Sequence, residues 1–200
     1  MTRKYELKRR AEQQAATRQR IVEATVALHE AIGGEATTIA AIAERAGVGR
    51  LTVYRHFPDE RALLTACTGH YLALNPPPDP AAWAGIADPA TRLRVALGEA
   101  YVYYRRTAGM LARAEQEAPT NPILADLMAP FAAFWESVRD GLVQGWGCAD
   151  APEPILVAAV GHALAFSTWR SLVQEQGLED GQAADLMVAL VRCAPWHDDT

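Results

Sequence analysis

The sequence predicts an all-α protein in two parts, an N-terminal three-helix domain and a C-terminal helical bundle. Apolar residues recur at helical spacing through most of the chain, and no convincing segment alternates apolar and polar residues as a half-buried strand does. Residues 75–80 hold four prolines, which a helix cannot accommodate in its interior. We therefore predict a basic extension over residues 1–16, a compact domain over 17–74 and a helical domain over 75–200.

The first helix of the compact domain is expected to start at Thr17 and to close at Gly33 and Gly34. The hydroxyl of Thr17 is suited to capping the free backbone N–H groups of a first turn, and glycine is suited to a helix end. The inward-facing residues are predicted to be Ile21, Val22, Ala24 and Leu28.

The next segment, residues 38–57, has the pattern of a helix-turn-helix. Thr38 is placed to cap its first helix, and Gly47 follows that helix where a left-handed residue is favoured. A second short helix then runs through residues 51–57. The apolar stripe of the first helix consists of Ile39, Ile42, Ala43 and Ala46. Two short helices joined by such a turn can present the second helix to a DNA major groove.

The second of these helices separates a buried face from a polar face. At about 100° per residue, Val53 and Phe57 point to the core while Thr52 and Arg55 point away from it. Guanidinium and hydroxyl groups can read base edges, and an apolar knob such as Leu51 can contact a thymine methyl group. The residues predicted to contact DNA are Thr17, Arg18, Thr38, Gly49, Arg50, Leu51, Thr52, Tyr54, Arg55 and His56.

Residues 17–66 resemble the DNA-binding domain of TetR-type transcriptional regulators. The pattern is T-I-x-x-I-A-x-x-A-G-V-x-x-x-T-V-Y-x-H-F, followed by the Ala-Leu-Leu of a further helix. The resemblance implies a helical C-terminal domain that binds an effector and dimerises through its last two helices. This chain departs from the family pattern at Glu60, where lysine is usual, and at Gly49, where a serine-like cap is usual.

In the C-terminal part, Asp88-Pro89 and Asn121-Pro122 each provide an N-cap followed by proline in the first turn of a helix. A third long helix is expected over residues 153–174 and a last one over 181–192. Aromatic residues and one histidine gather on these helices, as in a small-molecule pocket, although an ordinary core has the same pattern. The predicted ligand-binding residues are Tyr101, Tyr104, Phe131, Trp135, His162, Phe166 and Trp169. The predicted dimer interface contains Leu156, Val160, Leu164, Leu186, Met187 and Leu190.

Charge and composition agree with a nucleic-acid partner for the first part of the chain. Residues 1–75 hold 11 Lys or Arg and 8 Asp or Glu, a net charge of +3, whereas the whole chain has a formal charge of −5. The first twenty residues are the most basic, and they fit either an arm that touches DNA or a solvated tail. Three scattered cysteines and the lack of an apolar leader favour a cytoplasmic protein.

Together with the resemblance, these observations predict a transcriptional regulator that binds a palindromic operator as a homodimer and is released by a small hydrophobic or aromatic effector. That it represses transcription is what the resemblance to the family implies. No cofactor, metal or membrane partner is expected, and no catalytic motif is present. Two alternatives remain open, a DNA-binding regulator without an effector and a helical enzyme with a DNA-binding-like head.

Overall fold

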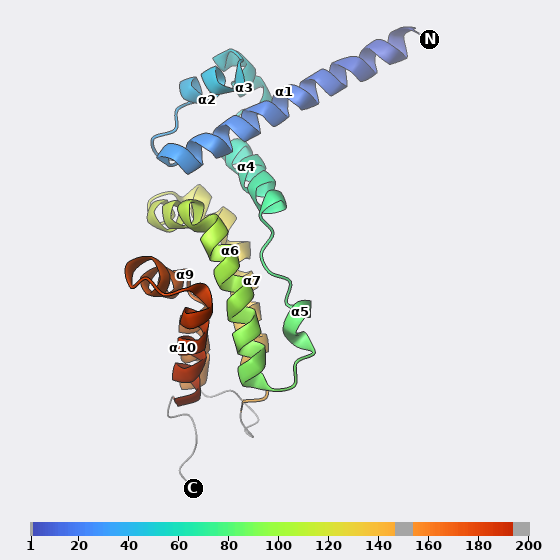
Figure 1. The fold of residues 1–200 in the computed structure, drawn as a ribbon. Coiled ribbons are helices and arrows are strands. Elements are labelled where there is room, and N and C mark those ends of the chain that lie inside the picture. The colour runs from blue at the N-terminus through green and yellow to red at the C-terminus, as the bar shows by residue number, and fades with distance from the viewer. Residues whose placement is uncertain (1, 147–153, 194–200) are drawn as a thin grey trace. The chain divides into compact units, whose positions relative to one another are not determined.

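The computed structural model describes residues 2–146 and 154–193, and each regular element in these two ranges is a helix (Figure 1). The all-α prediction is therefore confirmed. The elements are α1 (Thr2–Ile32), α2 (Ile39–Ala46), α3 (Arg50–His56), α4 (Glu60–Leu74), α5 (Ala81–Ala84), α6 (Pro89–Glu117), α7 (Pro122–Leu142), α8 (Pro154–Leu164), α9 (Phe166–Trp169), the π-helical turn η1 (Arg170–Glu175) and α10 (Asp180–Cys193).

The chain divides into two compact units. Unit 1 contains Met1–Pro76 and Ala112–Leu127, and unit 2 contains Pro77–Leu111 and Met128–Thr200. The first break lies in the proline-rich segment, which is also where the domain junction was predicted from the sequence. The return of residues 112–127 to unit 1 was not predicted, because their partners are distant in the sequence.

The core of unit 1 is formed by α1, α2, α3 and α4. Apolar stripes on these helices meet in one buried cluster, which contains most of the residues that the helical periodicity predicted, while Leu28 and Ile39 are partly buried and pack against it. Val53 and Phe57 are both within it, so the predicted inner face of α3 is confirmed. The fully assembled cluster consists of Ile21, Val22, Ala24, Ile42, Ala43, Ala46, Val53, Phe57, Leu63 and Cys67.

Side-chain and glycine caps fix the ends of the short helices. The Thr38 hydroxyl accepts a hydrogen bond from the Ala41 amide at 3.2 Å, and Gly47 has the left-handed φ of 65°. At the start of α4, the Asp59 carboxylate accepts a hydrogen bond from the Ala62 amide at 2.7 Å. The two α2 caps were predicted correctly because capping depends on residues only a few positions apart.

The predicted start of the first helix at Thr17 is wrong. Helix α1 continues back to Thr2, and the Thr17 hydroxyl donates to the Gln13 carbonyl at 2.9 Å, as a threonine inside a helix does. Residues 2–16 contain no glycine or proline and much alanine, glutamine, lysine and arginine, so nothing in them stops the helix.

The other end of α1 is held by the end of α6. Gly33 has a φ of 86°, and the Gly34 amide donates to the Glu117 carboxylate at 2.8 Å. The Arg113 guanidinium donates to the Ala31 carbonyl at 2.9 Å. A Cβ atom at Gly34 would lie 2.6 Å from a Glu117 oxygen, so a side chain there would require the Glu117 carboxylate to shift. These contacts bring residues 112–117 into unit 1.

Both predicted Asx-Pro helix starts are confirmed. The Asp88 carboxylate accepts a hydrogen bond from the Thr91 amide at 2.8 Å. The Asn121 side-chain oxygen accepts hydrogen bonds from the amides of Ile123 and Leu124, both at 3.0 Å. In each case the proline occupies the first helical position, where no N–H donor is needed.

The predicted third long helix is wrong in its second half, because it breaks at Ala165. This residue has an extended conformation with ψ of 136°, and the helical segments on either side of it are bent by 59°. The Tyr101 hydroxyl donates to the Ala163 carbonyl at 2.8 Å, and the Tyr104 hydroxyl donates to the Leu164 carbonyl at 2.6 Å. Two buried tyrosines of α6 thus satisfy carbonyl groups that the interrupted helix leaves free.

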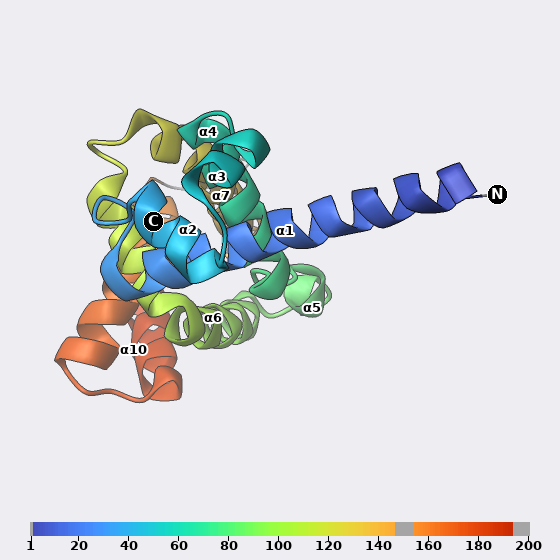
Figure 2. The same ribbon diagram turned by 90° about the horizontal axis from the view of Figure 1, so that it is seen from above.

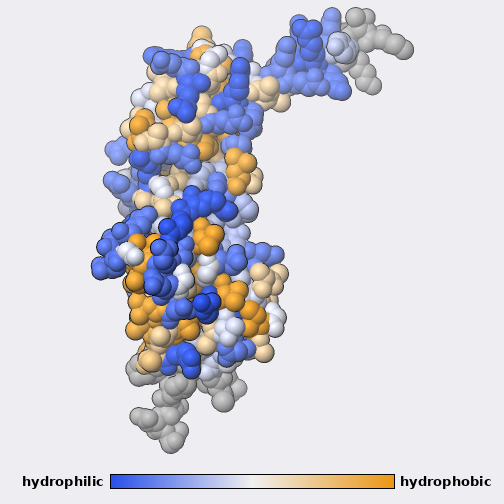
Figure 3. All heavy atoms as spheres, viewed as in Figure 1, coloured by the Kyte–Doolittle hydropathy of each residue, from blue (hydrophilic) through white to orange (hydrophobic). Residues whose placement is uncertain are grey.

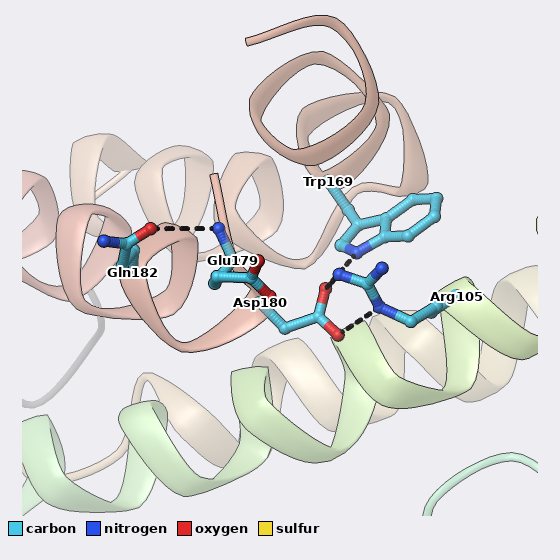
Figure 4. Close-up of polar contacts among 5 residues, drawn as sticks. All are labelled: Arg105, Trp169, Glu179, Asp180 and Gln182. Carbon is cyan, nitrogen blue, oxygen red and sulfur yellow. Dashed lines mark hydrogen bonds and ion pairs between the residues drawn. The ribbon is translucent and has the colours of Figure 1, made fainter. Parts of the chain in front are cut away.

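Helix α10 is joined to α6 and α9 through Asp180 (Figure 4). The Arg105 guanidinium donates to both Asp180 carboxylate oxygens, at 2.7 and 2.9 Å, and the indole N–H of Trp169 donates to the same carboxylate at 2.9 Å. Burial acts to raise the pKa of Asp180, but the hydrogen bonds from Arg105 and Trp169 and the Arg105 charge hold that pKa below its ordinary value.

Candidate functional sites

The outer face of α3 is the first candidate site. Leu51 is 86% exposed and Tyr54 is 52% exposed, although both are large side chains on a helix whose opposite face is in the core. Arg50 and Arg55 are exposed beside them. An exposed row of guanidinium, phenol and apolar groups on a short helix matches what a major groove offers.

The remaining predicted DNA contacts lie around this face. Thr52 and His56 are half-buried on α3, and Gly49 is the exposed N-cap of that helix, with no side chain to cap it. Thr38 is exposed at the start of α2, so its hydroxyl serves the cap and also faces solvent. Thr17 is half-buried in α1.

Positive charge gathers at the carboxyl end of α3. The Arg18 guanidinium of α1 lies over the Phe57 ring, 4.6 Å from its centroid, in a cation–π contact. Burial and then the charges of Arg55 and Arg18 lower the pKa of His56. An anion placed here would offset the mutual repulsion of these groups and would raise the pKa of His56.

The amino end of α4 carries Glu60, where the family pattern has lysine. Glu60 accepts a hydrogen bond from the side-chain amide of Asn121 at 3.3 Å. Neighbouring Arg61 forms an ion pair with Asp126 at 2.8 Å. Arg61 is thus held by Asp126, and Glu60 is a surface acceptor for the Asn121 amide.

A cluster of aromatic rings in unit 2 is the second candidate site. The Tyr104 ring centroid lies 5.3 Å from that of Trp135 and 5.5 Å from that of Phe166, and Phe166 stacks on Trp169 at 5.6 Å. Tyr101 joins the cluster through Tyr104, and Phe131 joins it through Trp135. The structure therefore brings together six of the seven residues predicted to bind a ligand.

His162, the seventh residue, lies apart from this cluster. It is exposed on α8, and its ring nitrogens are 3.3 and 3.4 Å from the Thr168 hydroxyl. The break at Ala165 changes the register, so the stripe expected of an unbroken helix no longer includes His162. Sequence reasoning missed Tyr103, whose buried ring contacts both Phe131 and Trp135 at 6.2 Å. Its position next to Tyr104 on the same helix could have indicated from the sequence that Tyr103 belongs to the cluster.

The polar groups of the aromatic cluster differ in their hydrogen bonding. The hydroxyls of Tyr101 and Tyr104 bond to backbone carbonyls, and the Trp169 indole bonds to Asp180. The Trp135 indole N–H is buried and has no hydrogen-bond partner in the part of the chain that the structure describes. A buried donor without a partner costs free energy, so this group favours an incoming acceptor.

The predicted dimer face needs correction. Four of its six residues are buried inside the single chain, because they form the packing between α8 and α10 and their neighbours. These residues are Leu156, Val160, Leu164 and Met187. Leu186 and Leu190 are exposed, at 40% and 54%, and Ile155 of α8 is exposed at 46%. Figure 3 shows hydrophobic residues gathered over the region where Figure 1 labels α10.

The described residues also bear on two other kinds of site. No group of three or more His, Cys, Asp or Glu side chains there is arranged to hold a metal ion. No single described helix is long and apolar enough to cross a bilayer, and α8 with the segment 166–175 meets that test only as a bent pair.

Comparison with known proteins assigns the first unit to a family. The model of the bacterial regulatory proteins of the tetR family matches residues 21–67. The HTH-type transcriptional repressor KstR of Mycolicibacterium smegmatis is 33% identical over 138 residues, which are 68% of this chain and 60% of that protein. KstR of Mycobacterium tuberculosis is 34% identical over 125 residues, or 62% of this chain and 50% of that protein. The chain thus spans between half and two thirds of the length of these relatives.

Solved structures share the fold. AibR, solved in complex with isovaleryl coenzyme A and operator DNA, has a TM-score of 0.60 and 21% identity, with 87% of this chain and 97% of that chain covered. A TetR transcription regulator from Haloarcula marismortui has a TM-score of 0.56 and 17% identity, with 89% and 95% covered. The matched segment and the two repressor relatives show that this chain carries the DNA-binding domain of the tetR family of bacterial regulatory proteins, and the solved structures share its fold.

Proposed function

We propose that this chain is a cytoplasmic, ligand-responsive transcriptional repressor that binds a palindromic operator as a homodimer. The observation that carries the proposal is the outer face of α3, where Arg50, Leu51, Tyr54 and Arg55 are exposed on a helix buried along its other side. The DNA-binding domain of the tetR family and the similarity to two repressors support the same assignment.

A second copy of the chain is the proposed occupant of the apolar face on α8 and α10. Leu186 and Leu190 follow one another at i and i+4 on α10, and Ile155 is exposed on α8, the helix that packs against it. Leaving three large apolar side chains in water is unfavourable. A two-fold symmetric contact would bury these three side chains on both subunits. A two-fold dimer would also present two α3 helices to half-sites about 34 Å apart, or a multiple of that spacing.

The proposed effector site is the aromatic cluster around Trp135. It consists of apolar rings in contact with one another, and the unpartnered indole N–H of Trp135 would donate to one acceptor on the effector. We therefore propose a hydrophobic or aromatic molecule that carries a carbonyl or similar oxygen. The AibR complex contains an acyl thioester of coenzyme A, which has such a group next to an apolar chain.

The proposed mechanism is a shift in population between two conformations of the dimer. Operator DNA favours one spacing of the two α3 helices and the effector favours another, so each ligand weakens the binding of the other by the same factor. Helix α6 carries the tyrosines of the aromatic cluster and, farther along, Arg113 and Glu117, which hold the end of α1. It is therefore the element through which we expect the two sites to be coupled.

The role of α3 is tested by comparing Arg50→Ala with Tyr54→Phe. Arg50→Ala should narrow the difference between specific and non-specific DNA affinity by roughly 1–3 kcal/mol, since a bidentate base contact carries sequence information. Tyr54→Phe should weaken binding to all DNA alike, because we expect the Tyr54 hydroxyl to bond a backbone phosphate, and such a contact carries no sequence information. Fluorescence anisotropy with operator and scrambled duplexes measures both effects. A uniform loss across sequences in both variants would show that Arg50 does not read bases.

The effector site is tested with Trp135→Phe, which keeps an aromatic side chain and removes the indole donor. Thermal-shift measurements with isovaleryl coenzyme A and a panel of hydrophobic ketones should find compounds that raise the melting temperature of the wild type. Trp135→Phe should bind such a compound roughly fivefold more weakly, since one neutral hydrogen bond contributes about 1 kcal/mol. The matched hydrocarbon without the carbonyl should bind both proteins equally. Equal carbonyl binding by both proteins would remove Trp135 from the site.

A further inference from the structure

The N-terminal half of α1 extends beyond the core of unit 1 and is exposed, without packing against other helices in the part of the chain that the structure describes. Residues 5–16 are all exposed, and the first buried residue of α1 is Ile21. Figures 1 and 2 show these first turns leading away from α2 and α3 in both views. We call residues 5–16 the arm. Tertiary packing usually stabilises a helix, and no described helix packs against the arm, so its side chains are available to a partner outside the chain.

The arm and the turn after it are strongly basic. Residues 5–20 contain five Lys or Arg, at 8, 9, 10, 18 and 20, and two Glu, at 6 and 12, a net charge of +3. The Glu12 carboxylate forms an ion pair with the Lys8 ammonium group at 3.9 Å. Figure 3 shows this part of the surface as hydrophilic. A basic helix of this kind favours an anionic partner.

The register of α1 directs part of this charge to the same side as α3. Arg10, Gln14 and Arg18 occupy positions i, i+4 and i+8, which lie on one face of a helix. Arg18 is the residue that lies over Phe57, the residue that caps the carboxyl end of α3. The face of the arm that carries Arg10 therefore continues the face of α1 whose Arg18 lies at Phe57, next to the carboxyl end of α3. Glu12 lies away from this face.

The apolar residues of the arm argue against a membrane as the partner. Tyr5 and Leu7 are 68% and 60% exposed, but two positions in a helix differ by about 200°, so they point in nearly opposite directions. A helix that lies on a bilayer needs a continuous apolar face, and the arm lacks one. Phosphate groups of nucleic acid require only the positive charge.

We infer that the arm binds the phosphate backbone of the DNA that flanks each operator half-site. This inference rests on the proposed DNA-binding function and extends it beyond the reach of α3. From Lys8 to Arg18 a helix spans about 15 Å, which corresponds to roughly four or five base pairs of duplex at 3.4 Å per pair. The arm thus lengthens the contacted DNA without adding sequence specificity.

The test uses two full-length variants and two duplexes. The neutral variant is Lys8→Gln with Arg9→Gln and Arg10→Gln, and the charge-preserving control is Lys8→Arg with Arg9→Lys and Arg10→Lys. One duplex is an inverted repeat selected by the wild type from a randomised library, trimmed to its selected core. The other is the same core with ten base pairs of unselected sequence on each side. Affinity is measured by fluorescence anisotropy over a range of salt concentrations.

The wild type and the charge-preserving variant should bind the flanked duplex more tightly than the core and with a steeper salt dependence. The neutral variant should bind both duplexes alike. Its log–log salt slope on flanked DNA should fall by roughly 1.8 units, because each of two subunits would then neutralise one phosphate fewer. All three proteins should melt at the same temperature, because the substituted side chains are exposed and lie outside the core of unit 1.

An unchanged slope and affinity for the neutral variant on flanked DNA would overturn the inference while leaving the proposed function intact. An equal loss on the core and flanked duplexes would also overturn it, since that result would indicate a general electrostatic effect and not a flanking contact. Failure of the library to yield any duplex bound by the wild type would instead remove the proposed function, and the inference with it.

Discussion

Leu190→Asp is expected to separate the two subunits of the proposed dimer and to abolish tight operator binding. The Leu190 side chain is 54% exposed in the single chain, beside exposed Leu186. A carboxylate at its position would have to be buried without a partner when two copies associate, which is strongly unfavourable. Sedimentation velocity should give about twice 21.7 kDa for the wild type and 21.7 kDa, the mass of one chain, for the variant.

The loss of dimerisation should weaken operator binding by roughly 10²–10⁴, because the second half-site then no longer binds within the same complex. Val102→Asp is the matched control, since Val102 is 58% exposed on α6 and lies on a different element. This control should remain dimeric and bind the operator as the wild type does. A wild type that sediments as a monomer, or a Leu190→Asp protein that stays dimeric, would exclude this face as the interface.

Asp180→Ala is expected to lower the free energy of unfolding by about 2–3 kcal/mol, because it removes a paired carboxylate and leaves the buried Trp169 N–H without its acceptor. Asp185→Ala is the matched control, because Asp185 on the same helix also pairs with an arginine of α6, Arg94, at 2.6 Å. Both partners of that second pair are more than half exposed, so its loss should cost at most about 1 kcal/mol. Urea denaturation measures both differences.

The effect of Asp180 should also depend on pH. Because the fold lowers the pKa of Asp180, its stabilisation is present above the unfolded value of about 3.9 and is lost as the pH falls through the folded value. The difference between wild type and Asp180→Ala should therefore shrink below about pH 4. Equal losses for Asp180→Ala and Asp185→Ala at neutral pH would contradict the role assigned to the Trp169 hydrogen bond.

Local features were predictable from the sequence. The caps at Thr38, Gly47, Asp88 and Asn121 and the burial of Val53 depend on residues within one or two helical turns. Periodicity and capping rules operate at that range, so they predicted the helix-turn-helix and the starts of α6 and α7.

Features that depend on distant residues were not predictable. The break at Ala165 is stabilised by hydroxyls of Tyr101 and Tyr104, which lie about sixty positions away. That break removed His162 from the aromatic cluster. The small and apolar residues assigned to a dimer face, such as Val160, are equally suited to packing within one chain, and periodicity cannot distinguish the two partners. The error at Thr17 has a different cause. A residue that can cap a helix does not mark its start when the residues before it also favour helix.

The most direct test of the account is the binding of the wild-type chain to the DNA immediately upstream of its coding region. The account predicts an inverted repeat there, bound by two chains and at least roughly 10³-fold more tightly than the same fragment with the repeat scrambled, at physiological salt. Anisotropy titrations with both fragments measure the ratio and the stoichiometry. Equal affinity for the intact and the scrambled repeat would contradict the claim that α3 of a two-fold dimer reads this operator.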